Sequence, residues 1–192
     1  MRDSMPTLVA LGGLKGSGKS TAAESLICNG FVRVKMAGAL KAMLDTLMKY
    51  QGASPVALEN YIEGDLKEHG CPYLAGRTPR HAMQTLGAEW GRDLIAQDFW
   101  VSVAKEAIVH NMNAGLSIVV DDVRYPNELE MIRSLGGVTV WIARPGVYQS
   151  LAHSSEKSIS AADFTLTVVN DGAERDLRRS ILSTLTEWST PR

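Results

Sequence analysis

The segment from Gly13 to Thr21 constrains this chain more than any other part of it. It reads GLKGSGKST and fits the pattern G-x-x-x-x-G-K-[ST] without a mismatch. Glycines let a backbone wrap around an anion, and successive backbone N–H groups at a helix start supply a positive dipole. Lys19 adds a full positive charge, and the Ser20 hydroxyl can ligate magnesium. The segment therefore predicts a nucleotide phosphate-binding loop made of Gly13, Leu14, Lys15, Gly16, Ser17, Gly18, Lys19, Ser20 and Thr21.

The residues on both sides of this segment supply the context that such a loop needs. A short apolar run at 7–11 precedes it, and residues 20–28 read as a helix that closes near Asn29 and Gly30. A strand, a glycine-rich loop and a helix thus follow one another, as a phosphate-binding loop requires. The alternative is an ordinary glycine-rich turn before a helix, and the flanking pattern argues against it.

The composition fits a compact enzyme that acts on small molecules. With 192 residues, 45% of them hydrophobic, the chain can form one domain with helices on both faces of a sheet. The formal net charge of -1 argues against bulk attraction to a nucleic acid polymer or an acidic membrane. Cys28 and Cys71 form neither a disulfide framework nor a zinc pattern, which favours a cytoplasmic protein. No stretch approaches the roughly 18 apolar residues of a membrane span, so we expect solubility.

Strand-like and helix-like segments alternate along the rest of the chain. Further strands are predicted at 31–35, 117–122, 138–143 and 163–169. Helices are predicted at 38–50, 79–95, 99–113, 126–135 and 173–188. Glycines and prolines punctuate residues 51–78, which suits either a mobile insertion that covers a substrate or an ordinary surface loop with one short helix. The alternation predicts a parallel sheet covered on both sides.

Two adjacent carboxylates, Asp121 and Asp122, end the strand predicted at 117–122. A carboxylate at the end of a strand beside the phosphate-binding loop can hold water on the magnesium that Ser20 ligates. A helix cap or a pair with Arg124 is the alternative role. Spacing alone does not choose between the two aspartates.

Basic and amide side chains elsewhere form candidate anion contacts. Arg80 and Gln84 lie four residues apart on a predicted helix, which suits a guanidinium that grips a phosphate and an amide that reads a base edge. Solvated helix charges and core tryptophans explain the same segment equally well. Arg144 ends a strand, and it either stabilises a transferring phosphoryl group or is an exposed loop charge.

Four segments of the chain, considered together and in order, point to a known family. They are GLKGSGKST, PRHAMQTLGAEWGRDLIAQDFW, VVDDVRYPNELEMIRSLGGVTVWIARPG and VVNDGAERDL. In this combination the chain resembles the bacteriophage-type deoxynucleoside monophosphate kinases. The resemblance implies an α/β fold of the P-loop NTPase type, with three layers and a five-stranded parallel sheet with helices on both faces. It also implies an NMP-binding insertion at about 38–100 and a short lid at about 145–162.

The same resemblance implies a reaction and assigns roles to residues. ATP and Mg²⁺ would be the cofactors, and the γ-phosphoryl group of ATP would pass to a deoxynucleoside monophosphate. The catalytic residues would be Lys19, Arg124 and Arg144. Magnesium would be held by Ser20 and by Asp122, while Asn170 and Gly172 would lie near the donor base. The substrate-binding residues would be Lys41, Lys67, Arg80, Gln84, Trp90, Asp98, Trp100 and Arg124.

Other classes of function compete with this reading. A kinase of dephospho-coenzyme A or of another small molecule would use a similar core. A nucleotide-dependent switch would want NKxD and DxxG motifs, and the chain carries Asp122-Val123-Arg124-Tyr125 after its strand instead. A polynucleotide end kinase would want a basic groove, which the net charge does not indicate. We therefore expect no nucleic acid polymer and no membrane as partners, and we leave a homodimer open.

Overall fold

The structure, a computed structural model, describes residues 5–147 and 159–189. The chain divides into two compact units, which we call the sheet unit and the helical unit. The sheet unit comprises Met1–Lys35 and Lys105–Arg192, and the helical unit comprises Met36–Ala104. None of the described helices is long and apolar enough to cross a membrane.

Five parallel strands form the sheet, in the order β2-β3-β1-β4-β5. They are β1 (Leu8–Gly12), β2 (Phe31–Arg33), β3 (Ser117–Val120), β4 (Val138–Ala143) and β5 (Leu166–Val169). The central strand β1 pairs Ala10 with Val120 of β3 on one side and with Thr139 of β4 on the other. The predicted five-stranded parallel sheet is confirmed. All five residues of β1 are buried, as expected for a central strand with both faces covered.

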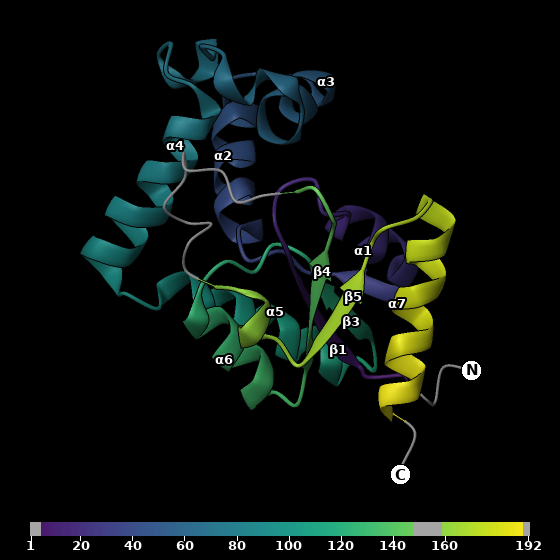
Figure 1. Cartoon of the computed structure of the whole chain (residues 1–192). Helices are drawn as coiled ribbons and strands as arrows, with labels where there is room; N and C mark the ends of the chain where they lie inside the picture. The colour runs from purple at the N-terminus through teal and green to yellow at the C-terminus, as the bar shows by residue number, and fades with distance from the viewer. Residues whose placement is uncertain (1–4, 148–158, 190–192) are drawn as a thin grey trace. The chain divides into compact units, whose positions relative to one another are not determined.

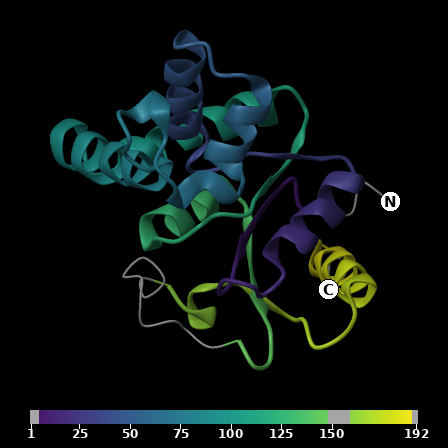
Figure 2. The same cartoon turned by 90° about the horizontal axis from the view of Figure 1, so that it is seen from above.

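Helices cover both faces of this sheet (Figure 1). Helices α1 (Lys19–Cys28) and α7 (Glu174–Ser189) lie side by side on one face, where Figure 2 also shows them together. Helix α6 (Pro126–Ser134) packs against β1 and β4. The residues of helix α5 (Phe99–Asn113) begin in the helical unit and end in the sheet unit. The core between the sheet and α1 and α7 includes Leu11, Leu26, Val119, Val140, Ile142, Leu177, Ile181 and Leu185.

The helical unit is built from short helices around a small core of its own. Its elements are α2 (Gly38–Tyr50), α3 (Pro55–Leu58), η2 (Glu59–Glu63), η3 (Asp65–Glu68), η4 (Pro72–Leu74), α4 (Pro79–Thr85) and η5 (Leu86–Ile95). The buried residues Leu44, Met48, Leu58, Ile62 and Cys71 form that core. Residues 51–78, expected to be irregular, therefore carry short helices and buried side chains. The insertion predicted at 38–100 falls inside this unit, and its binding role stays a prediction.

The helix predicted at 79–95 changes character in its middle. Thr78 caps it as expected, because its hydroxyl accepts a hydrogen bond from His81 N at 3.1 Å. From Leu86 onward, however, the backbone widens into a π-helix. The Trp100 indole donates to Gly87 O at 2.9 Å, and Gly91 leaves the space for that ring. The π-helix thus coincides with a contact from Trp100, which lies outside the segment. Helical periodicity predicts neither the contact nor the π-helix.

Three predicted strands are shorter than expected. The strand predicted at 31–35 ends at Arg33. The strand predicted at 117–122 ends at Val120, so Asp121 and Asp122 lie in the loop that follows. The strand predicted at 163–169 begins at Leu166, after a short 3-10 turn (η7) at Ala161–Asp163. The differences at β3 and β5 place polar residues beyond the hydrogen-bonded ladder of the sheet.

Candidate active site

The segment from Gly13 to Lys19 forms a tight loop between β1 and α1. Gly13 has φ +144°, and a Cβ there would lie 2.5 Å from Ser17 Oγ and 2.6 Å from Ile142 O. Gly18 has φ +105°, and a Cβ there would lie 2.6 Å from Asn170 Nδ2. Both the backbone conformation and the close neighbours therefore require glycine at these two positions.

Lys19 folds back over the start of this loop. Its Nζ donates to Gly13 O at 2.7 Å and to Leu14 O at 2.9 Å. An ammonium group placed against two carbonyl oxygens lies inside the ring of the loop, where a phosphate group would be wrapped. Lys15, Gly16 and Ser20 are exposed on the same segment.

Asn170 supports the loop from the end of β5. Its Nδ2 donates to Ser17 O at 2.8 Å, and its backbone N donates to Ala143 O at 2.7 Å. The Asn170 side chain is buried, with 7% of the residue exposed. The structure thus gives Asn170, predicted to lie near the donor base, a contact that fixes the loop itself. Gly172 is exposed after it.

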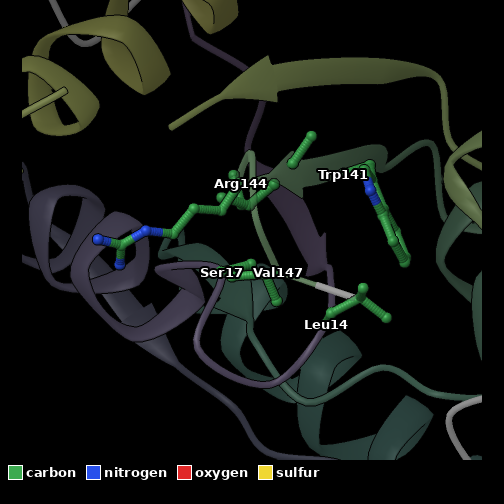
Figure 3. Close-up of a pocket in the computed structure, with 7 residues that line it drawn as sticks. Leu14, Ser17, Trp141, Arg144 and Val147 are labelled. Atoms are coloured by element: carbon green, nitrogen blue, oxygen red, sulfur yellow. The ribbon is translucent and has the colours of Figure 1, made fainter. Parts of the chain in front are cut away.

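A small cavity of about 110 Å³ lies beside the loop (Figure 3). Its lining includes Leu14, Ser17, Trp141 and Val147, and the buried Ser17 hydroxyl has no hydrogen-bond partner among the described residues. Small-molecule sites typically measure about 300–1,000 Å³. The cavity is thus a recess next to the loop, too small for a whole nucleotide. The Arg144 guanidinium points away from Trp141 and Leu14 (Figure 3).

The two aspartates after β3 have different surroundings. Asp121 Oδ2 lies 3.4 Å from Arg33 Nη2, with only 10% of the Asp121 side chain exposed. Asp121 is therefore engaged as the partner of a largely buried arginine from β2. Asp122 follows it at the same edge of the sheet, where the loop of the neighbouring strand β1 also leaves. The pair with Arg33 thus involves Asp121, the first of the two aspartates.

The residues present fit a magnesium ion that is held mainly by phosphates and water. Magnesium typically takes one or two protein oxygens besides substrate phosphates, and not a dedicated protein cage. Within the described residues, no group of three or more His, Cys, Asp or Glu side chains could hold a metal. The predicted ligands, the hydroxyl of Ser20 and the carboxylate of Asp122, are oxygen donors of the kind that magnesium takes.

Glu128 is a buried carboxylate in this region that the sequence analysis did not single out. Its Oε2 accepts hydrogen bonds from Arg124 N at 2.6 Å and from Tyr125 N at 3.1 Å. Arg124 itself is exposed at the start of α6, so Glu128 fixes the backbone from which it projects. A glutamate three residues after the N-cap, here Tyr125, is the sequence signal that points to such a cap.

Arg144 is exposed at the end of β4, where its Nη1 donates to Gly16 O at a long 3.4 Å. Residues 148–158 of the lid predicted at 145–162 lie outside the described residues. At the far end of that segment, the pKa of the Asp163 carboxyl lies below its ordinary value. The cause is chiefly the Ser160 backbone N–H and then the Ser160 hydroxyl, both of which donate to it.

In the helical unit, three predicted substrate ligands pair with carboxylates. Lys41 Nζ donates to both carboxylate oxygens of Glu63, at 2.8 and 2.7 Å. Lys67 Nζ lies 3.9 Å from the same carboxylate. Arg80 Nε donates to Glu68 Oε1 at 2.8 Å. The structure therefore brings Lys41 and Lys67 together at one carboxylate.

The other predicted substrate ligands of this unit differ in exposure. Gln84 and Asp98 are exposed. Trp90 and Trp100 pack together with ring centroids 5.9 Å apart. Trp100 is only 8% exposed, and its indole N–H donates a hydrogen bond to Gly87 O. The structure thus gives Trp100 a packing role in addition to the substrate contact predicted for it.

The predicted site residues divide between the two units. The phosphate-binding loop, Asp122, Arg124, Arg144, Asn170 and Gly172 belong to the sheet unit. Lys41, Lys67, Arg80, Gln84, Trp90, Asp98 and Trp100 belong to the helical unit. The residues predicted to bind the donor thus belong to the sheet unit. The residues predicted to bind only the acceptor belong to the helical unit.

Comparison with known proteins identifies relatives of the chain. A putative deoxynucleotide monophosphate kinase of Acanthamoeba polyphaga mimivirus is 29% identical over 188 residues, which cover 92% of this chain and 94% of that protein. The deoxynucleotide monophosphate kinase of Enterobacteria phage T4 is 30% identical over 111 residues, which cover 55% of this chain and 44% of that protein. The solved structure of TT1252 from Thermus thermophilus shares the fold, with a TM-score of 0.53 and 17% identity over 97% of this chain and 100% of that one.

A family model for deoxynucleotide monophosphate kinase matches residues 77–181, more than half of the chain. The match begins before Arg80 and runs through Asp122, Arg124, Arg144 and Asn170. The chain therefore belongs to the deoxynucleotide monophosphate kinase family.

Proposed function

We propose that this phosphotransferase moves the γ-phosphoryl group of ATP to the phosphate of a deoxynucleoside 5′-monophosphate. A phosphate oxygen of the acceptor forms the new P–O bond, the β–γ bond of ATP breaks, and the products are a deoxynucleoside diphosphate and ADP. The observation that carries the proposal is the phosphate-binding loop, with Lys19 held inside it and glycine required at Gly13 and Gly18. Membership of the family supports the acceptor class.

On the donor side, the loop supplies backbone N–H groups and the charge of Lys19. Phosphoryl transfer depends on positioning and charge neutralisation more than on a reactive side chain. When a nucleotide binds, we expect the Lys19 ammonium to exchange Gly13 O and Leu14 O for phosphate oxygens. Arg124, exposed just before α6, and Arg144, exposed directly after β4, would neutralise charge on the transferring group.

Magnesium would be held by Ser20 and, through water, by Asp122. When bound, the ion neutralises charge on the donor phosphates. Asp121 would hold Arg33 instead.

On the acceptor side, the helical unit supplies Lys41, Lys67 and Arg80 for the phosphate. Their charges suit a dianionic monophosphate, and Gln84 offers an exposed amide that can read a base edge. No general base is needed, because the acceptor phosphate already presents an anionic oxygen. Trp90 and Asp98 would contact the nucleoside, and Trp100 would support Trp90 by packing against it.

Two further parts of the proposal concern setting. Among the residues that the structure describes, Cys28 and Cys71 are both free, which supports action in the reducing cytoplasm. Both substrates are small molecules, so the reaction requires neither a nucleic acid polymer nor a membrane. Whether two copies associate is a separate question, which the molar mass in solution answers.

A coupled assay of ADP release tests the proposal. The protein is offered ATP with each ribo- and deoxyribonucleoside monophosphate and with dephospho-coenzyme A. We expect turnover with at least one deoxynucleoside monophosphate and none with dephospho-coenzyme A. The Lys19→Ala variant should lose turnover while it unfolds cooperatively, because the lost charge serves phosphates. Retention of more than about a tenth of wild-type activity would contradict the role of the loop.

A further inference from the structure

We propose that Glu63 is a built-in counter-ion of the acceptor phosphate site, one that weakens the binding of highly charged anions and so favours release of the diphosphate product. The inference rests on the proposed function, because it takes Lys41 and Lys67 as ligands of the acceptor phosphate. Glu63 is then a specificity-determining residue for that reaction.

The geometry around Glu63 is that of a shared carboxylate. Both of its oxygens accept hydrogen bonds from Lys41 Nζ, and Lys67 Nζ lies 3.9 Å from Oε2. The three side chains come from α2, η2 and η3 and are between 20% and 33% exposed. An anion that reaches either lysine therefore meets the negative charge of Glu63 at close range.

Glu63 is held in place by the backbone on both sides of it. Ile62, directly before it, is buried in the core of the helical unit. Gly64, directly after it, donates its N–H to Glu59 O at 2.8 Å, and a Cβ on Gly64 would lie 2.9 Å from Asn60 Cα. The chain thus turns tightly behind Glu63, and the carboxylate is fixed where Lys41 reaches it.

Charge explains why a carboxylate there affects mono- and diphosphates unequally. Lys41, Lys67 and Glu63 together carry a net charge of about +1, against about +2 without the carboxylate. Repulsion by the carboxylate grows with the charge of the anion. A monophosphate carries about two negative charges at neutral pH, and a diphosphate carries about one more. The carboxylate therefore opposes the product more strongly than the substrate.

The Glu63→Gln variant isolates this charge. Its amide oxygen can still accept a hydrogen bond from Lys41 Nζ, while the negative charge is gone. For charges roughly 6–8 Å apart near water, we expect the monophosphate to bind this variant about 3- to 15-fold more tightly than the wild type. The gain in affinity for the diphosphate should be larger than this by a further factor of about 2 to 4. The gain should shrink as salt is raised from low to high concentration, which a merely structural role would not produce.

Calorimetry measures both affinities with matched controls. The probes are the deoxynucleoside monophosphate that the wild-type protein phosphorylates fastest and its diphosphate. Saturating ADP without magnesium occupies the phosphate-binding loop and prevents turnover. Glu24→Gln is the charge control, because it removes an exposed carboxylate of the sheet unit that is paired with Arg178. Glu63→Ala is a second test of the lost charge, and Lys41→Met tests whether the lysine binds the acceptor.

Each result has a distinct meaning. Tighter binding in Glu63→Gln and Glu63→Ala, larger for the diphosphate and sensitive to salt, supports the proposal when Glu24→Gln binds like the wild type. Unchanged or weaker binding in Glu63→Gln overturns it, and the acceptor site stands if Lys41→Met still weakens binding. If Lys41→Met binds like the wild type, the acceptor assignment fails and this inference fails with it. If the wild-type protein phosphorylates no deoxynucleoside monophosphate, the proposed function itself fails.

Discussion

Replacement of Asn170 separates a structural role from a role in donor binding. The Asn170 amide donates to Ser17 O at 2.8 Å from a position that is 7% exposed. Asn170→Ala removes a buried donor from the phosphate-binding loop, and the loss of such a partner costs about 1 to 3 kcal/mol. For a chain of this length, that corresponds to a fall of about 2 to 12 °C in Tm. Asn170→Asp should cost at least as much, because a carboxylate has no N–H to donate.

Thermal and urea unfolding of the nucleotide-free protein measure this loss. Asn111→Ala is a matched control, since Asn111 Nδ2 donates to Ala107 O at 2.7 Å on an exposed helix surface. We expect the control to change the free energy of unfolding by less than about 0.5 kcal/mol. ATP affinity, measured by calorimetry, should fall along with stability in the Asn170 variants, because ordering a looser loop around the phosphates costs more conformational entropy.

The opposite pattern would refute this reasoning. If Asn170 mainly contacts the donor base, Asn170→Ala will leave the Tm of the nucleotide-free protein at the wild-type value and will change only ATP affinity and the preference among donor bases. A Tm within the spread of the Asn111→Ala control would therefore show that the hydrogen bond to Ser17 O does not hold the loop.

Four further substitutions test other contacts. Asp122→Asn should reduce turnover in a way that raised magnesium partly restores. Asp121→Asn should chiefly lower the Tm, because it leaves Arg33 without its partner. The reverse pattern would show that the two aspartates have exchanged roles. Arg80→Ala should weaken monophosphate binding in calorimetry by roughly 10- to 150-fold, while an equal loss of ATP affinity would count against an acceptor role. Gly91→Ala should lower the free energy of unfolding by roughly 1–3 kcal/mol in urea titrations, since its Cβ would lie 2.1 Å from Trp100 Nε1, and an unchanged midpoint would contradict that packing.

The parts of the fold that local pattern determines could be predicted from the sequence. The helices at α2 and α5 have the predicted bounds, because apolar spacing and glycine or proline boundaries are local signals. The parallel direction of the strands could be predicted from their alternation with helices. The π-helical turns of η5 could not be predicted, because they involve the indole of Trp100 and its contact with Gly87 O.

The same division applies to the candidate site. The phosphate-binding loop was identifiable because its residue types and spacing carry its chemistry. Spacing could not predict that Asp121 pairs with Arg33, because Arg33 lies on β2, far away in sequence. Likewise, nothing local links Glu63 to Lys41 across 22 positions. Pairings between distant residues depend on how the backbone folds, and single-sequence patterns do not record them.

The continuity of the helical unit has a consequence for how this enzyme could be re-engineered or diversify. Residues 36–104 form one uninterrupted stretch with its own buried core, and the residues assigned to the acceptor alone fall within it. If these residues bind the acceptor as proposed, recombination at two points, after β2 and within α5, would exchange the substrate preference as one segment. The phosphate-binding loop, Asp122 and the arginines of the sheet unit would be inherited unchanged. Exchange of the helical unit would then change the acceptor while the residues proposed for phosphoryl transfer stay the same.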